Sequence, residues 1–375
     1  MKNQTLLTLF LWASLTLVSC VTSHPTTATP KLTLPNEFTQ GYEPLEHEVA
    51  DSLDDATVIS SPLYHSPLLE VGYIHEDNTV VGVYSDRGVV TGWRVDTTDL
   101  AFAYELGIVT SKALTLIGSG KYVIGAREHN FKPNSSNQDI EYVNGIGLWD
   151  VRAGNLIKCL SFPCQGAPLP RDGFLGLAVD TDGNQLAVFS ETGYSLISIF
   201  EDAPSLHITP IALDSPYHWR IGSIVLDNLN SRYIIIFQEG RIHVYEGEKI
   251  TSYRIIAEGV KGDIIPVTDA QIDPTGRWLV FARGDTTKVL SLDNRKILLE
   301  VNVPNPVLAF DETGELLFVG SANKLTIYRV ETGEKIAEYD TVGITSLAIS
   351  EDNRLVIWGD TQGAIHVWAK PLSQP

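Results

Sequence analysis

The side chains best suited to covalent chemistry in this 375-residue sequence are three cysteines. Cys20 ends an apolar stretch near the N-terminus, while Cys159 and Cys164 lie close together in the segment CLSFPC. In an oxidising compartment, Cys159 and Cys164 could form a disulfide that closes a short loop. The alternative is one buried thiol and one free thiol, and the sequence leaves both open.

The residues before Cys20 have the features of an export signal. Lys2 gives a positive start, and residues 6–18 (LLTLFLWASLTLV) are apolar over a length typical of a signal-peptide core. Residues 17–20 (LVSC) resemble the lipobox of bacterial lipoproteins: an apolar residue, two tolerant positions and an obligatory cysteine. The resemblance implies that residues 1–19 are a signal peptide and that Cys20 carries a thioether-linked lipid. A plain secretory signal is the alternative.

The same resemblance suggests a location. Residue 21 is Val, whereas an Asp at this position retains enterobacterial lipoproteins in the inner membrane. The implied location is therefore the bacterial cell envelope, with the periplasmic side of the outer membrane favoured. Residues 20–52 begin with a Thr- and Pro-rich stretch, which favours an extended tether. No later stretch of eighteen apolar residues follows, so we expect the lipid to be the membrane attachment.

A search for catalytic, metal and cofactor motifs is mostly negative. The sequence contains no G-x-S-x-G, H-E-x-x-H or Walker motif, and its nine histidines are scattered. His243 and His366 both stand in the segment IHV, which indicates a repeated structural position and not a metal site. We therefore expect no enzyme activity and no cofactor.

The charge balance excludes one class of partner. With 46 acidic and 27 basic residues, the formal net charge is −19. Phosphate binding requires a basic surface, so nucleic acid is not the expected partner.

One phrase occurs twice, as LWDVRAGNLI at residues 148–157 and IYRVETGEKI at 327–336. From about residue 68, an apolar strand, a turn rich in Asp, Asn and Gly, a very apolar second strand and a third strand recur seven times, and six of these units supply a fourth strand. The second strands are expected at 80–85, 122–127, 185–190, 233–238, 278–283, 316–321 and 355–360. Seven four-stranded units at this spacing predict an all-β fold, a seven-bladed β-propeller.

The seventh unit supplies only three strands before the sequence ends. Residues 54–60 (DDATVIS) form an isolated strand pattern before the first unit. We expect this N-terminal strand to complete the seventh blade, because an open ring would expose apolar faces and strand edges. The predicted propeller domain is therefore 53–375.

The units resemble WD40 repeats over residues 68–370. The resemblance is carried by GLWDV at 147–151, GAIHVWAK at 363–370 and the turns DPTG and DETG. It implies a WD40-like propeller, although the Gly-His pair that opens many WD40 repeats does not occur. A quinoprotein-like outer-membrane assembly factor is an alternative, but Tyr339 stands where that family has Trp.

One long loop suggests a binding surface. Residues 128–145 separate two strands that other units join by a short break, and long loops are often functional. In a WD40-type ring this loop shares a rim with the blade-joining segments 164–174, 214–220 and 258–268. Aromatic residues and Arg commonly anchor protein interfaces. The candidate partner-binding residues are Phe131, Tyr142, Arg171, Tyr217, His218 and Trp219. The alternative is that Tyr217 and Trp219 pack inside a blade junction.

Two functions are compatible with this organisation. The first is a non-enzymatic scaffold that presents its top-face loops to a protein partner. The second is a propeller-type hydrolase or lactonase, which needs acids or histidines at the starts of the inner strands. Only Asp269 opens such a strand, and no histidine lies among these starts. The sequence therefore favours the scaffold, with an unknown protein partner.

Overall fold

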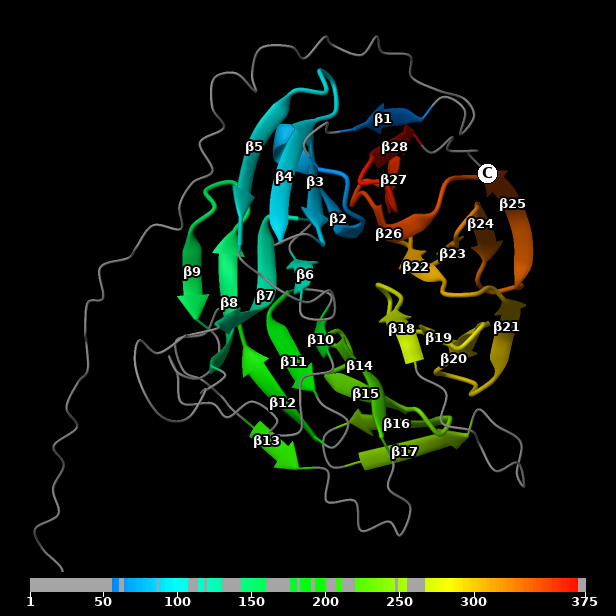
Figure 1. Cartoon of the computed structure of the whole chain (residues 1–375). Coiled ribbons are helices and arrows are strands. Elements are labelled where there is room, and N and C mark those ends of the chain that lie inside the picture. Colours follow the sequence, from blue (N-terminus) through cyan, green and yellow to red (C-terminus); the bar gives the residue numbers. More distant parts are fainter. Residues whose placement is uncertain are drawn as a thin grey trace, which may run out of the picture.

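The described part of the chain forms a ring of seven antiparallel sheets, each of four strands (Figure 1). The computed structural model describes residues 56–60, 64–85, 88–106, 114–117, 120–129, 143–159, 176–180, 183–189, 193–199, 207–210, 220–246, 249–254 and 267–369. Within these residues, the only helical element is the short 3-10 turn η3 (His75–Asp77). The predicted seven units of four strands are confirmed.

Each sheet, or blade, is an antiparallel meander that runs from an inner strand to an outer strand. Blade 1 contains β2 (Leu68–Ile74), β3 (Thr79–Tyr84), β4 (Val89–Arg94) and β5 (Leu100–Glu105). Blade 2 contains β6 (Leu114–Ile117), β7 (Tyr122–His129), β8 (Val143–Asp150) and β9 (Leu156–Cys159). Blade 3 contains β10 (Gly176–Val179), β11 (Gln185–Phe189), β12 (Gly193–Ser198) and β13 (His207–Pro210).

The remaining blades follow the same order. Blade 4 contains β14 (Ile221–Asp227), β15 (Arg232–Phe237), β16 (Arg241–Glu246) and β17 (Lys249–Arg254). Blade 5 contains β18 (Val267–Ile272), β19 (Trp278–Arg283), β20 (Thr286–Ser291) and β21 (Ile297–Asn302). Blade 6 contains β22 (Val307–Phe310), β23 (Leu316–Gly320), β24 (Lys324–Arg329) and β25 (Glu334–Asp340). Blade 7 contains β26 (Ile344–Ile349), β27 (Leu355–Asp360), β28 (Ile365–Ala369) and β1 (Thr57–Ile59).

Blade 7 is built from both ends of the described chain, as expected from the sequence. Strand β1 is its outer strand and pairs antiparallel with β28, with Thr57 opposite Val367 and Ile59 opposite Ile365. The predicted strand spanned 54–60, and the paired strand is its second half. The sheet that joins the two ends prevents the first and last units from separating.

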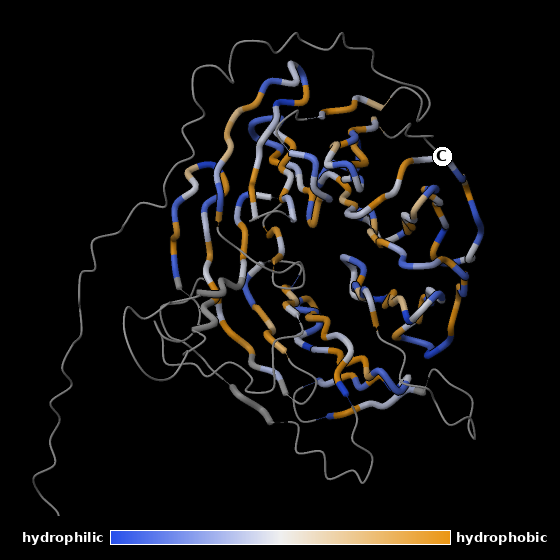
Figure 2. The backbone as a smooth tube through the Cα atoms, viewed as in Figure 1, coloured by the Kyte–Doolittle hydropathy of each residue, from blue (hydrophilic) through white to orange (hydrophobic). Residues whose placement is uncertain are grey.

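Apolar side chains fill every junction between neighbouring blades. The described residues form seven buried clusters, and each cluster combines residues of two adjacent blades. Successive residues of a second strand contribute to opposite clusters: in β19, Leu279 and Phe281 face blade 4, whereas Val280 and Ala282 face blade 6. Figure 2 shows the resulting concentration of hydrophobic residues in the strands. Apolar second strands are therefore required because both of their faces are covered.

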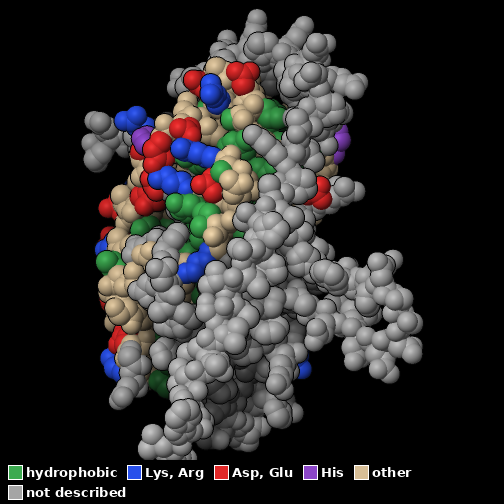
Figure 3. All heavy atoms as spheres, turned by 90° about the vertical axis from the view of Figure 1, so that its left-hand side faces the viewer, with side chains coloured by type: hydrophobic (Ala, Val, Ile, Leu, Met, Phe, Trp, Pro, Cys, Tyr) green, Lys and Arg blue, Asp and Glu red, His purple; other side chains and the backbone are tan. Residues whose placement is uncertain are grey.

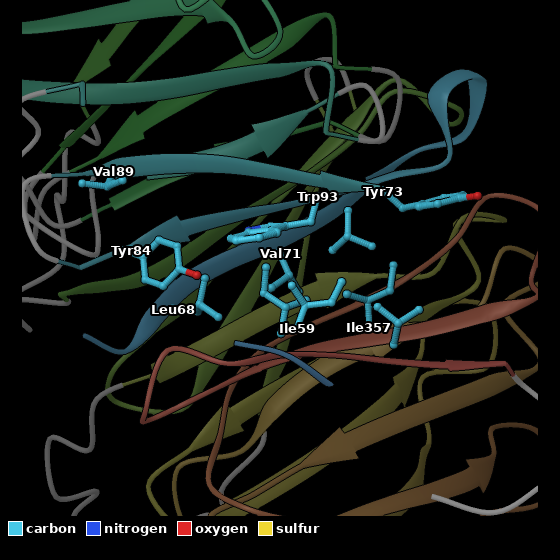
Figure 4. Packing of buried hydrophobic residues seen from close by; sticks show 11 residues of the cluster. Ile59, Leu68, Val71, Tyr73, Tyr84, Val89, Trp93 and Ile357 are labelled. Atoms are coloured by element: carbon cyan, nitrogen blue, oxygen red, sulfur yellow. The ribbon is translucent and has the colours of Figure 1, made fainter. Parts of the chain in front are cut away.

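The junction between blades 7 and 1 closes the ring. Figure 4 shows Ile59, Leu68, Val71 and Ile357 packed together, and all four are almost completely buried. Gly359 on β27 lies so close to Leu68 that an added Cβ would stand 2.5 Å from the Leu68 Cβ. The two blades therefore approach closely where the chain ends meet.

Acidic side chains and glycines shape the turns between inner and second strands. Asp311 Oδ1 accepts hydrogen bonds from the Leu316 N–H (2.9 Å), and Asp180 Oδ1 does the same for the Gln185 N–H (2.9 Å). Gly183 and Gly314 follow these acids with φ values of 70° and 69°, a region that glycine adopts at little cost. These turns lie where the sequence predicts turns rich in Asp, Asn and Gly.

The long loop predicted at 128–145 is shorter than expected. Strand β7 continues to His129 and β8 begins at Val143, with Glu128 opposite Asn144 in the ladder. The prediction was wrong at both ends, because residues whose polarity indicated a loop continue the pairing of a hairpin. Residues 130–142 lie outside the described residues. No helix in the described part of the chain is both long and apolar enough to cross a membrane.

The closing strand supports a quantitative prediction. Ile59 is 2% exposed in the blade 7–blade 1 cluster, whereas neighbouring Val58 is 41% exposed. We expect Ile59→Ala to lower the free energy of unfolding by roughly 2–4 kcal/mol, because it leaves a cavity in a closed core. The matched control Val58→Ala is expected to cost less than about 1 kcal/mol. Urea unfolding of both variants tests this, and equal losses would show that β1 is not packed into the ring.

Candidate functional site

The six candidate partner-binding residues lie outside the described residues. These are Phe131, Tyr142, Arg171, Tyr217, His218 and Trp219. The same holds for Cys20 and Cys164, while Cys159 is the last residue of β9. The candidate site that the structure allows us to describe is therefore on the ring axis, where the inner strands meet.

Four inner strands share an irregularity that sets which residues reach the axis. The register shifts by one residue after Leu68 in β2, and the same shift occurs in β14, β18 and β26. The residue after each shift pairs with the next-to-last residue of the second strand. These matching positions hold Glu70, Ser223, Asp269 and Ser346. Bulges of this kind bend a strand and re-aim a side chain.

The inner strands of blades 1 to 5 surround a cavity of about 500 Å³, which we call the axial cavity. Its apolar lining residues include Leu114, Leu177, Val179 and Ile224, although polar atoms form the larger part of its exposed surface. Its polar lining includes two carboxyl groups, those of Glu70 and Asp269, together with Thr115, Ser223, Gln238 and Gln271. None of the described residues that line the cavity is Lys, Arg or His.

Asp269 ties blade 5 to blade 6. Its Oδ2 accepts a hydrogen bond from the Leu308 N–H (3.2 Å), and Gln271 Nε2 donates to the Leu308 carbonyl (2.6 Å). An inner strand has an unpaired edge toward the axis, where buried backbone groups need partners. Two side chains of β18 supply these partners for Leu308 of β22.

Glu70 has a different environment. Burial, followed by the negative charge of Asp269, raises the pKa of its carboxyl group to about 8. No hydrogen bond opposes this rise. Burial also raises the pKa of Asp269, to about 6, although hydrogen bonds from the backbone N–H groups of Leu308 and Ala270 oppose this rise. Glu70 is therefore mainly protonated at neutral pH and Asp269 mainly ionised, so the cavity can present a proton donor and an acceptor together.

Sequence reasoning found Asp269 but missed Glu70. The pattern of the first inner strand begins with an apolar residue and gives no acid at its start. The bulge places Glu70 at the register position that matches Asp269. A usable signal was present: Leu68-Leu69-Glu70 and Val267-Thr268-Asp269 share the spacing of an apolar residue, any residue and an acid.

The two IHV histidines occupy a repeated position in their sheets, as the sequence indicated. His243 lies opposite Ile235, and His366 lies opposite Trp358, at matching places in their sheets. The buried His366 Nε2 is 2.9 Å from Asp360 Oδ2, and its ring stacks on Trp358 with centroids 4.9 Å apart. Within the described ranges, no three His, Cys, Asp or Glu side chains gather as metal ligands would.

Comparison with known proteins identifies the architecture. No protein-family model matches the chain, and no curated protein is similar to it. Among solved structures, the β-propeller domain of Cps50 (Swd1) from Myceliophteria thermophila is similar, with a TM-score of 0.61 and 16% sequence identity. The similarity covers 84% of this chain and 99% of that domain. The chain is a seven-bladed β-propeller. At this identity, the similarity shows the propeller fold alone.

Outside the axis, charged side chains of the propeller form ion pairs between blades. Arg152 Nη2 of blade 2 lies 2.6 Å from Asp77 Oδ2 of blade 1, and the Lys121 ammonium group pairs with the Glu76 carboxylate. Figure 3 shows acidic and basic side chains intermixed on the described surface of this side of the ring. Such exposed pairs contribute little stability. The axial carboxyl groups differ because no described base faces them.

The raised pKa of Glu70 predicts a pH-dependent stability. The folded propeller binds this proton more tightly than the unfolded chain, so the free energy of unfolding falls as pH rises from about 4.5 to about 8. Glu70→Gln removes this loss, and we expect the variant to exceed the wild type by roughly 3 kcal/mol at pH 9 but by much less at pH 5.

Chemical unfolding at several pH values tests this prediction. Glu331→Gln is the matched control, because Glu331 is exposed and we expect its variant to follow the wild type. Identical pH profiles for the wild type and Glu70→Gln would contradict the assignment of the titrating group.

Proposed function

We propose that the chain is a non-enzymatic scaffold of the bacterial cell envelope, anchored by a lipid on Cys20, whose propeller binds another protein. The observation that carries this proposal is the closed ring of blades. Strand β1 closes the ring, and folds of this type are typical of protein-interaction scaffolds. The variable parts of such a ring are its loops, which commonly carry function.

The strand directions support one binding face. Strands alternate in direction within each blade, so the end of a second strand and the end of an outer strand lie on the same face of the ring. His129 and Val143 flank residues 130–142 on this face, and Cys159 and Gly176 flank the next connection. This topology favours a common surface for the candidate residues Phe131, Tyr142, Arg171, Tyr217, His218 and Trp219.

A loop deletion tests the binding face. We expect replacement of residues 130–142 by a two-residue turn to leave thermal unfolding nearly unchanged but to abolish recovery of the partner, which is identified by crosslinking the native protein in membranes. Leu229→Ser is the control, because Leu229 is 66% exposed in a turn at the opposite face. Full recovery of the partner by the deletion variant would remove this loop from the proposed surface.

Lipid attachment is tested separately. With a lipid on Cys20, cells grown with an alkyne-tagged fatty acid should yield labelled wild-type protein in the outer-membrane fraction. The Cys20→Ser variant should carry no label, because a hydroxyl does not take the place of the thiol in the thioether. A plain secretory signal instead gives unlabelled wild-type protein in the soluble periplasmic fraction, and this result would contradict the anchor.

The second candidate is a hydrolase or lactonase that acts in the axial cavity. The observation that favours it is the pair of carboxyl groups with different protonation, since one raised acid and one ionised carboxylate can serve as general acid and base. Asp269 is nevertheless already engaged by Leu308, which gives it a structural role. Turnover of an ester or lactone that is lost in Asp269→Asn would favour this candidate over the scaffold.

A further inference from the structure

The axial cavity has the dimensions of a small-molecule site. Its volume of about 500 Å³ lies within the roughly 300–1,000 Å³ common for such sites. Its lining combines apolar side chains, including the buried Leu114, Phe189 and Ile224, with polar groups that form the larger part of the exposed surface. A space of this size admits an organic molecule, which can contact apolar side chains such as Leu177 and Ile224 while its polar group meets the polar part of the lining.

The charged side chains in the described lining of the cavity are all acidic. Glu70 and Asp269 extend from blades 1 and 5, and Asp269 lies near enough for its charge to act on Glu70. On the outer surface, Asp77 and Glu76 are paired with Arg152 and Lys121. The described lining of the cavity contains no such base. A positively charged group between the two carboxyl groups would replace their repulsion with attraction.

The Glu70 carboxyl group is the one that can accept further hydrogen bonds. Both polar backbone groups of Leu308 are bound by Asp269 and Gln271, so these two side chains are held in place. No hydrogen bond to the Glu70 carboxyl group contributes to its ionisation. An ammonium or guanidinium group can donate to such a carboxylate, and charge-assisted hydrogen bonds are the stronger kind.

We propose that the axial cavity binds a small organic cation, whose ammonium or guanidinium group lies between Glu70 and Asp269 while its apolar part contacts the cavity walls. A divalent metal ion is the less suitable ligand, because these two carboxyl groups are the only acids among the described lining residues and no third His, Cys, Asp or Glu joins them. The proposal is independent of the lipid anchor and of a protein partner on the loops.

The test uses the full-length protein and three probes. Isothermal titration with 2-phenylethylamine and benzamidine should show binding, whereas the uncharged 2-phenylethanol should not bind measurably. Because the cation favours the ionised form of Glu70, binding should release protons at pH 7. The apparent binding enthalpy should therefore differ between buffers of different ionisation enthalpy.

Three variants locate the site. Glu70→Gln should weaken binding of the amine about tenfold or more and abolish proton release, since it removes one charge-assisted hydrogen bond. Asp269→Asn should also weaken binding, and Glu331→Gln should bind as the wild type does. The comparison of amine with alcohol requires no variant, so it decides the question even if a variant does not fold. Equal binding of amine and alcohol, no binding of either cation at millimolar concentration, or unchanged binding by folded Glu70→Gln would overturn the proposal.

Discussion

The constraint on which this structure depends is that each blade has two apolar faces and no means of covering either one alone. Leu279 and Val280 are neighbours in β19, yet one packs against blade 4 and the other against blade 6. A linear stack of such sheets would leave two faces in water at its ends. The ring removes both ends, and β1 joins the first part of the described chain to the last by pairing with β28. Closure is therefore a packing requirement of these sheets.

The same arrangement determines the character of the axis. Because each blade begins with its inner strand, seven strand edges face a narrow space and their backbone groups need hydrogen-bond partners. Asp269 and Gln271 of blade 5 meet this need for Leu308 of blade 6. Glu70 occupies the matching position in blade 1, but its carboxyl group is influenced chiefly by burial and by Asp269. The same position therefore holds a carboxyl group that binds a neighbouring strand in blade 5 and a carboxyl group with a raised pKa in blade 1.

The surface and the axis suggest two separate uses of one ring. The ends of β7, β9, β13 and β17 lie on one face of the ring, and the proposed contacts with a protein partner belong to this face. The axial cavity is built instead from inner strands, which positions Glu70 and Asp269 more firmly than loops would. The proposed cavity site and the proposed loop surface are therefore built from different elements of the ring.

The sequence by itself determined the repeat, the second strands, the Asp- and Gly-containing turns and the closing strand, because these depend on local patterns of polarity and on the need to cover apolar faces. It predicted too long a loop at 128–145, since the polar residues Glu128 and Asn144 pair in a ladder that polarity does not reveal. Only the tertiary structure brought Glu70 and Asp269 to one cavity, although about 200 residues separate them in the chain. The physical reason is that a one-residue bulge sets which side chains reach the axis, and ring closure sets which of them meet there.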